Sequence, residues 1–534
     1  MTTRWVQIRK DLFQQVESQV RHLLGEESKG LSQYRREFEK EFRKKWKVSS
    51  KNQLMAAIAG AQIVYIGDFH ALQQSQRAQL RILKALPSKT EAILAVEFLE
   101  ARHQKHIDQY LQGRLSDREF LKAIEWKKNW GFPWEHYKPL LKWAQKNKIK
   151  VYGLNFLSHE KSAITLKKRD QFAANRIAEI QKKYSNHTVF VIFGDLHLAP
   201  PHLPAQVAKQ RAPKGKALRE VFVFQNIERV YFQLLEKGSE LEVDVVRWAG
   251  NKFCLMSVPP WVKWQNYLIY LEENFDKEID DELDLTDSVA KYVNVIADDL
   301  GVKVSVNHFT VSGPGERKFW DELQAKLPDE SLKFCEGLIE VGRSFYWPEL
   351  GLAYLARNSV NSAAELAMAI VFAEISRQKS RPSKVPQDFV AMIWQEAVQY
   401  FGSKLINPKR KTDTFNDIKA ALSSRHPGDQ GREALQLALN QKMMELLFLS
   451  GSRRQTELLR QRGLRSYMEA ARILGGILGE KMFHAYRQKT LSKATVLGLL
   501  KKNPESSQFS QIYWEILEVI ENLPEPFQSK TEKL

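Results

Sequence analysis

The pattern of hydrophobic and polar positions changes twice along the chain. From about residue 54 to residue 258, short runs of β-branched and aromatic residues alternate with segments of helical periodicity. This alternation is typical of an α/β domain with a mainly parallel sheet and flanking helices. The expected strands are Ile63–Ile66, Ile93–Phe98, Lys150–Leu154, Thr188–Phe193, Val221–Gln225 and Glu242–Trp248. The expected helices are Ser75–Leu86, Ala101–Leu111, Asp117–Lys127, Trp134–Lys146 and Lys167–Tyr184.

Helical patterns flank this region on both sides. In residues 1–50, apolar residues recur every three or four positions, which predicts an N-terminal helical arm. Its charged part carries an aromatic residue every fourth position, and such a stripe favours docking onto the next domain over binding to another protein. The aromatic residues of this stripe are Tyr34, Phe38, Phe42 and Trp46.

The part of the chain after the α/β region differs in composition. Residues 259–289 begin with two prolines and contain an acidic stretch, so they are expected to form a linker. Residues 290–534 are expected to form a mixed and then mainly helical C-terminal region of unknown role, with strands at Val302–Val306 and Leu338–Phe345.

Composition narrows the classes of protein to consider. With 534 residues and two cysteines, the chain has the size of several domains and lacks the thiols for a disulfide framework or a cysteine zinc site. The formal charge of +18 favours acidic partners without selecting one. The longest apolar stretches fall short of the roughly 18 residues of a membrane span, and no apolar signal segment opens the sequence. We therefore expect a cytoplasmic protein without a transmembrane segment.

Two segments of the α/β region repeat one motif. A buried-looking strand leads directly into Gly-Asp-x-His at Asp68 and His70, and again at Asp195 and His197. In open α/β sheets, ligands bind at the carboxyl ends of the strands, where both motifs are expected. The sequence thus predicts a site that contains both histidines, with Asp68 and Asp195 in support.

A third strand contributes a carboxylate. Glu97 lies inside the apolar run of residues 95–98, where a charge is costly unless it is paired or ligates a cation. His70, His197 and Glu97 together form a ligand set suited to a divalent transition metal such as Mn, Fe, Co or Zn. A metal at this position would activate water for hydrolysis. Without a metal, the same groups would act as a histidine general base oriented by a carboxylate.

Other residues are candidates for the surrounding pocket. Asn155 follows the expected strand Lys150–Leu154, and His202 lies in a proline-rich turn after the second motif. Both are expected to contribute to ligand or cofactor binding. The common signatures of nucleotide-binding loops, zinc proteases and serine hydrolases are absent from the sequence.

In its motifs and their order, this region resembles the ChaN-like haem-binding uptake proteins, within the superfamily that includes the Tiki metalloproteases and the erythromycin esterases. The resemblance covers roughly residues 54–258. It rests on Val64–His70, Ala95–Phe98, Leu111–Leu115, Asn129–Gly131, Val151–Asn155 and Gly194–Leu198.

The resemblance implies a site better than it implies a substrate. It makes His70, His197 and Glu97 the active-site or metal-binding groups. In Tiki-like members such a set supports metal-dependent peptide hydrolysis, in the esterases it supports ester hydrolysis with a histidine base, and ChaN-like members bind haem. This sequence departs from the family pattern in having Asp68 where members often carry glutamate, and Phe156-Leu157-Ser158 where ChaN-like proteins commonly have Pro-Arg.

Three functional hypotheses follow. The first is a metal-dependent hydrolase that acts on an ester or peptide bond of a small molecule or peptide. The second is a protein that binds haem or another iron compound in the same pocket, and the third is a basic, non-catalytic interaction scaffold. Nucleic acid is not an expected partner, because no recognised nucleic-acid motif is present. The sequence leaves the oligomeric state open.

Overall fold

The computed structural model describes residues 3–87, 90–156, 162–210, 218–274, 285–305, 308–379, 381–425, 431–452 and 463–524. The chain divides into two compact units, Met1–Asn274 and Phe275–Lys533. Within the described ranges, no helix combines the length and the apolar character that a membrane crossing requires.

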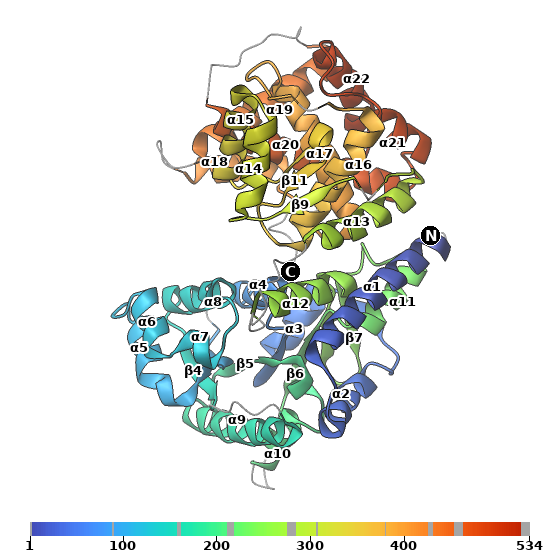
Figure 1. Cartoon of the computed structure of the whole chain (residues 1–534). Coiled ribbons are helices and arrows are strands. Elements are labelled where there is room, and N and C mark those ends of the chain that lie inside the picture. The colour runs from blue at the N-terminus through green and yellow to red at the C-terminus, as the bar shows by residue number, and fades with distance from the viewer. Residues whose placement is uncertain are drawn as a thin grey trace. The chain divides into compact units, whose positions relative to one another are not determined.

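The first unit is built on an eight-stranded sheet with the order β1-β7-β8-β6-β2-β5-β3-β4 (Figure 1). Its strands are β1 (Lys47–Ser49), β2 (Ile63–Asp68), β3 (Ala92–Glu100), β4 (Lys150–Asn155), β5 (Thr188–Gly194), β6 (Glu220–Gln225), β7 (Val245–Trp248) and β8 (Lys252–Leu255). The six neighbouring strands from β8 to β4 pair in parallel, and β7 runs antiparallel to both of its neighbours. The predicted fold class is confirmed.

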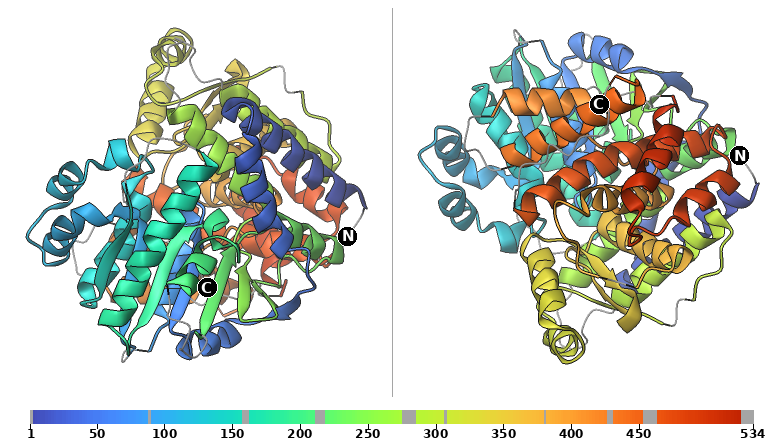
Figure 2. Two further views of the ribbon diagram at one scale, coloured as in Figure 1. Left: turned by 90° about the horizontal axis from the view of Figure 1, so that it is seen from below. Right: turned by 90° about the horizontal axis from the view of Figure 1, so that it is seen from above.

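Helices cover both faces of this sheet (Figures 1 and 2). They are α1 (Thr3–Leu24), α2 (Lys29–Glu41), α3 (Lys51–Ala59), α4 (Gln73–Lys84), α5 (Gln104–Leu111), α6 (Asp117–Ala123), α7 (Trp126–Asn129), α8 (Trp134–Lys146), α9 (Ala163–Lys183), α10 (Leu203–Lys209), α11 (Glu228–Lys237) and α12 (Pro260–Asn274), with short 3₁₀ turns η1 (Ala101–His103) and η2 (Asp195–Leu198). Every residue of β2 and β3 is buried. Burial on both faces explains why these strands are continuously apolar in the sequence.

The N-terminal arm packs on the sheet as its aromatic stripe predicts. Phe42 lies edge-on to Phe224 of β6 and to Trp248 of β7, and Phe38 also contacts Phe224. The arm consists of two helices because Gly25 adopts a positive φ after α1. These contacts make the arm part of the first unit.

The segment predicted as a linker, residues 259–289, begins with a helix. α12 contacts α1 through Trp264 and Phe13, so it belongs to the first unit. The next ten residues lie outside the described ones.

The second unit is mainly helical. Its helices are α13 (Leu285–Leu300), α14 (Arg317–Lys326), α15 (Asp329–Glu340), α16 (Val360–Ser376), α17 (Phe389–Ile406), α18 (Phe415–Ser423), α19 (Arg432–Leu449), α20 (Leu464–Arg487), α21 (Lys493–Leu500) and α22 (Phe509–Glu521). The small sheet, of order β10-β11-β9, consists of β9 (Thr310–Ser312), β10 (Phe345–Trp347) and β11 (Leu352–Tyr354). The predicted helical region after residue 360 is confirmed.

Both strands predicted for this unit were placed wrongly. Residues 302–305 have no regular structure, Val306 lies outside the described residues, and the strand begins at Thr310. Within Leu338–Phe345, the first three residues end α15, and β10 begins only at Phe345. The apolar pair Leu338-Ile339 continues a helical pattern, and Gly342 with its positive φ follows the helix end.

Close packing of α17 against α20 depends on glycine. A Cβ on Gly479 of α20 would overlap the carbonyl oxygen of Ala397 in α17, and a Cβ on Gly475 would lie 2.7 Å from the Ala397 nitrogen. Because backbone atoms form the contact, a side chain at these positions forces the helices apart.

We expect Gly479→Ala to lower the free energy of unfolding of the second unit by roughly 1–3 kcal/mol, as overpacking of a core does. The measurement is chemical denaturation of the full chain. Gly498→Ala is the matched control, since a Cβ there meets nothing within 4 Å in helix α21, and alanine should leave stability unchanged or raise it by up to about 1 kcal/mol. Equal stability of the two variants would contradict the close approach of α17 and α20.

Candidate active site

The two Gly-Asp-x-His motifs lie on neighbouring strands. β2 pairs with β5 in parallel from Ile63 opposite Val189 to Asp68 opposite Gly194, so both chains leave the sheet at the same edge. β3 pairs with the other side of β5 and carries Glu97. Strand pairing therefore brings together the three segments on which the sequence placed the site.

Glu97 lies between the two histidines. Its Oε2 is 3.7 Å from His70 Nε2, and its Oε1 is 3.9 Å from His197 Nε2. Oε2 also accepts a hydrogen bond of 2.6 Å from the Gly194 backbone nitrogen. The Glu97 side chain is 4% exposed, so this backbone donor helps to offset the cost of burying its charge. The predicted His70, Glu97 and His197 set is thus in one place.

Asp68 orients His70. Its Oδ2 lies 2.7 Å from His70 Nδ1, and it also accepts hydrogen bonds from Gln76, Gln79 and Tyr137 at 2.6, 2.9 and 3.2 Å. With an ionised Asp68, the ring proton of neutral His70 resides on Nδ1. The unprotonated Nε2 then faces Glu97.

The ionisation of His70 reflects two opposing effects. Burial would lower its pKa, but the carboxylates of Asp68, Glu97 and Asp195 outweigh burial and raise the pKa above its ordinary value. The rings of Trp130 and Phe132 flank the imidazole, with centroids at 4.6 and 5.1 Å. The His70 side chain nevertheless stays 24% exposed, so a ligand can reach it.

His197 has a different carboxylate partner from the one its motif suggests. Its Nδ1 lies 2.6 Å from Asp170 Oδ1 in α9, and the Tyr34 hydroxyl of α2 donates to Asp170 Oδ2 at 2.8 Å. The same hydroxyl lies 3.0 Å from His197 Nδ1. Burial, followed by Asp170, raises the pKa of Tyr34, which keeps its hydroxyl protonated as a donor.

Tyr34 and Asp170 belong to the site although their place in it was not predicted from the sequence. For Asp170 a signal exists, because it occupies the buried face of α9 together with Ala173, Ala174 and Ile177. A carboxylate on an apolar helix face needs a partner. Tyr34 gives no such signal, since it continues an ordinary aromatic stripe.

Asp195 does not repeat the role of Asp68. Its side chain lies over Gly67, where a Cβ would overlap Oδ1. In the described structure, neither carboxylate oxygen has a hydrogen-bond partner, and both are buried. Burial raises its pKa to about 7, although Lys263 opposes the shift. Asp195 thus contributes a carboxyl group that titrates near pH 7, rather than a partner for His197.

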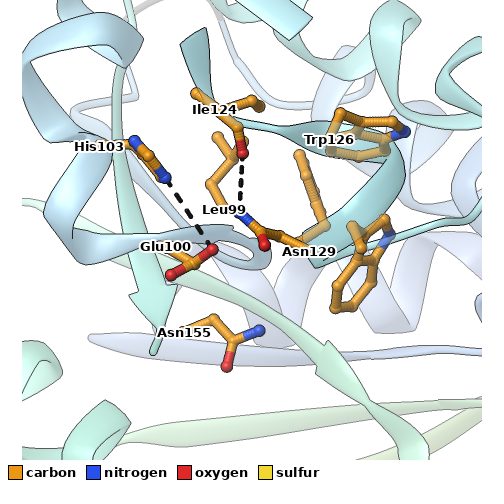
Figure 3. A pocket seen from close by; sticks show the side chains of 9 residues that line it. Leu99, Glu100, His103, Ile124, Trp126, Asn129 and Asn155 are labelled. Atoms are coloured by element: carbon orange, nitrogen blue, oxygen red, sulfur yellow. Dashed lines mark hydrogen bonds and ion pairs between the residues drawn. The ribbon is translucent and has the colours of Figure 1, made fainter. Parts of the chain in front are cut away.

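The two residues predicted to bind a cofactor lie in different places. His202 stacks on Tyr34 with 3.5 Å between ring centroids, and its nitrogens contact the Leu196 carbonyl oxygen at 2.6 Å and Glu37 Oε2 at 3.0 Å. It therefore supports Tyr34 rather than offering a free nitrogen. Asn155 lies at the end of β4 and lines a pocket that also contains Glu100 (Figure 3).

The predicted metal ligands remain a prediction. Among the residues that the structure describes, no group of three or more His, Cys, Asp or Glu side chains is arranged to hold a metal ion. The arrangement instead presents an imidazole oriented by a carboxylate, which is suited to general acid–base chemistry.

The stability of the chain should depend on pH through Asp195. Because folding raises its pKa from 3.8 to about 7, the folded chain keeps a proton between these values that the unfolded chain has lost. Stability therefore falls as pH rises through this window, by at most about 4 kcal/mol. We expect Asp195→Asn to raise the melting temperature, and to raise it more at pH 8 than at pH 5.

Asp117→Asn is the control with the opposite sign. Lys138, at 2.8 Å, and the Tyr110 hydroxyl hold the pKa of Asp117 at about 2. This substitution should lower the melting temperature, with a larger loss at pH 5 to 8 than at pH 2. A pH-independent effect of Asp195→Asn would contradict the burial of an unpaired carboxyl group.

Part of the first unit matches a known protein family. A family model described as haem-binding uptake, Tiki superfamily, ChaN matches residues 54–167. A solved structure of cofacial haem binding to ChaN of Campylobacter jejuni is 16% identical, over 34% of this chain and 88% of that chain, with a TM-score of 0.26. No curated protein matches the sequence. The family match ends before Asp170 and His197.

Proposed function

Since residues 54–167 form a domain of the haem-binding uptake, Tiki superfamily, ChaN family, we propose that this chain is a hydrolase of ester or peptide bonds in which His70 activates water. One observation carries the proposal. Two histidines, each oriented by a carboxylate, face the two oxygens of one buried glutamate.

His70 is the general base. Asp68 accepts a hydrogen bond from Nδ1–H of His70. The lone pair on Nε2 is then available to a water molecule. The 3.7 Å between Nε2 and Glu97 is too long for a direct hydrogen bond, so Glu97 does not occupy the Nε2 lone pair. When His70 takes the proton from water, the negative charge of Asp68 stabilises the imidazolium, as in other histidine–carboxylate pairs.

Glu97 and His197 position the water and its surroundings. Glu97 is fixed by the Gly194 backbone nitrogen and presents its carboxylate to both imidazoles. His197 is only 6% exposed and is fixed by Asp170, so we assign it a positioning role toward Glu97 rather than contact with substrate. The water adds to the acyl carbon, the bond to the leaving group breaks, and the proton held by His70 passes to that group.

A divalent metal is the alternative way to activate the water. His70, Glu97 and His197 have the right ligand chemistry, and carboxylates on the far ring nitrogens are the support that metal-bound histidines use. Among the described residues no three-ligand group of this kind is found, and the steps above use side chains alone.

The test is hydrolysis of a panel of esters and peptides by the wild type and by His70→Ala. We expect the substitution to lower kcat/KM by about 10²–10⁴-fold, the usual contribution of a general base, with little change in melting temperature. Activity of the wild type should rise with pH through a pKa above 6.5, because the surrounding carboxylates raise that of His70. His187→Ala is the control, since that histidine lies beside Glu91 at the start of the strands.

Two results would overturn this mechanism. Full activity in His70→Ala would remove His70 as the base. Stoichiometric Mn, Fe, Co or Zn in the purified wild type that is lost in His197→Ala, measured by mass spectrometry, would replace it with metal-activated hydrolysis.

Haem binding is a second candidate, favoured by the aromatic rings beside His70. Phe132 stacks on Tyr270 at 4.4 Å, and Tyr270 is parallel to Tyr267 on the same helix. A tyrosine is an established haem ligand. His70 fits this role poorly, because its Nε2 faces Glu97 and would lie only 3.4 Å from a Cβ on Gly194.

A haem titration followed by absorption distinguishes this candidate. Binding at the aromatic rings predicts a Soret shift that saturates at one equivalent, persists in His70→Ala and is lost in a Tyr267→Phe, Tyr270→Phe double variant. Haem uptake that does not saturate would exclude the tyrosines as the haem site. A Soret shift in the Tyr267→Phe, Tyr270→Phe double variant equal to that of the wild type would exclude them as well.

A further inference from the structure

A pocket opens at the carboxyl ends of β3 and β4 (Figure 3). The bulge in β3 shifts the register between Val96 and Glu100, so that Glu100 comes opposite Asn155. Bulges next to active sites re-aim side chains in this way. The residues that line the pocket are Phe98, Leu99, Glu100, His103, Ile124, Trp126, Asn129, Trp130 and Asn155.

The pocket is adjacent to the catalytic imidazole. Trp130 lines it and also meets the His70 ring edge to face, with 4.6 Å between the ring centroids. A group held in this pocket therefore lies one indole ring away from His70.

The polar lining includes two hydrogen-bond acceptors, Glu100 and Asn129, beside the donor Nε1 of Trp130. The Glu100 carboxylate is 7% exposed. Asn129 donates its amide to the Ile124 carbonyl oxygen at 3.1 Å, and this leaves Asn129 Oδ1 buried without a hydrogen-bond partner in the described structure. Trp126 and Trp130 add aromatic rings. Carboxylate, amide oxygen and indole together form an environment that attracts a cation.

Glu100 already has a cationic partner on the surface of the domain. Arg102 contacts both oxygens of Glu100, with Nε 2.9 Å from Oε2 and Nη2 3.4 Å from Oε1, and its Nη2 also lies 3.9 Å from Glu125 Oε2. Burial lowers the pKa of His103, which keeps it neutral near pH 7. Arg102 is half exposed, so a substrate ammonium in the pocket would replace a solvent-accessible guanidinium as the partner of Glu100.

We propose that this pocket holds a protonated amine of the substrate, so that the bond presented to His70 is the acyl bond of an aminoacyl ester or of a peptide with a free amino terminus. The substrate class rests on the proposed hydrolase function. In the reaction, water forms the new bond to the acyl carbon, the ester or amide bond breaks, and the leaving group takes the proton from His70. No oxidant or other reactant is needed.

Binding of glycinamide to the full chain, compared with propionamide, tests the pocket independently of catalysis. The two molecules have nearly the same shape, and only glycinamide carries an ammonium group. Isothermal titration should give at least tenfold tighter binding of glycinamide to the wild type. Glu100→Gln should weaken glycinamide binding at least tenfold and leave propionamide binding unchanged.

Matched variants make the result specific to the pocket. Glu125→Gln removes the other carboxylate that Arg102 contacts, yet Glu125 does not line the pocket, so glycinamide binding should change less than twofold. If Glu100→Gln fails to fold, Asn129→Ala removes the second acceptor and should weaken glycinamide binding several-fold. His70→Ala should bind glycinamide as the wild type does.

The failures of the two proposals can be told apart. Equal binding of glycinamide and propionamide, or binding that Glu100→Gln leaves intact, overturns the amine pocket whatever the esterase activity. Normal glycinamide binding together with no hydrolysis of glycine p-nitrophenyl ester supports the amine pocket and overturns the hydrolase function.

Discussion

The site depends on a negative charge buried in the middle of a parallel sheet. Glu97 occupies a strand in which all nine residues are buried, and a carboxyl group in such a place is costly without a hydrogen-bond donor. The Gly194 nitrogen supplies one donor, and the imidazoles of His70 and His197 face its two oxygens. Each imidazole is in turn fixed by a second carboxylate. The hydrogen bonds of Asp68 and Asp170 to the two imidazoles are thus arranged around this one buried carboxyl group.

The network extends beyond the part of the chain that the family model matches. His197 and Asp170 lie after residue 167, and Tyr34 lies before residue 54. His202 stacks on Tyr34 and so ties the second motif to the N-terminal arm. Because α2 supplies a hydroxyl to the site, the arm is a structural part of it rather than a docking segment alone.

The sheet and the edge that carries the candidate site could be predicted from the sequence, because both leave strong patterns of residues. Long apolar strands followed by Gly-Asp-x-His predicted that Asp68, His70 and His197 would gather with Glu97, and strand pairing brings their segments together. The short strands β1 and β8, of three and four residues, carry too little periodicity to be found. The partner of His197 could not be predicted from its motif, because a helix supplies it from 27 residues away.

The two motifs also show why repetition in sequence does not imply repetition in structure. Asp68 accepts hydrogen bonds from side chains of α4 and α8, whereas Asp195 follows β5 between its neighbours and has no such donors in the described structure. One carboxyl group therefore orients an imidazole, whereas burial raises the pKa of the other to about 7.

This difference matters for the charge of the site. The chain as a whole carries a formal charge of +18, yet the candidate site gathers the carboxyl groups of Asp68, Glu97, Asp170 and Asp195 around two imidazoles. The net charge of the chain thus says little about the ligand of this site, since excess lysine and arginine elsewhere on the chain set the total. Local carboxylates, and the proton that burial keeps on one of them, determine which charges the site can accept.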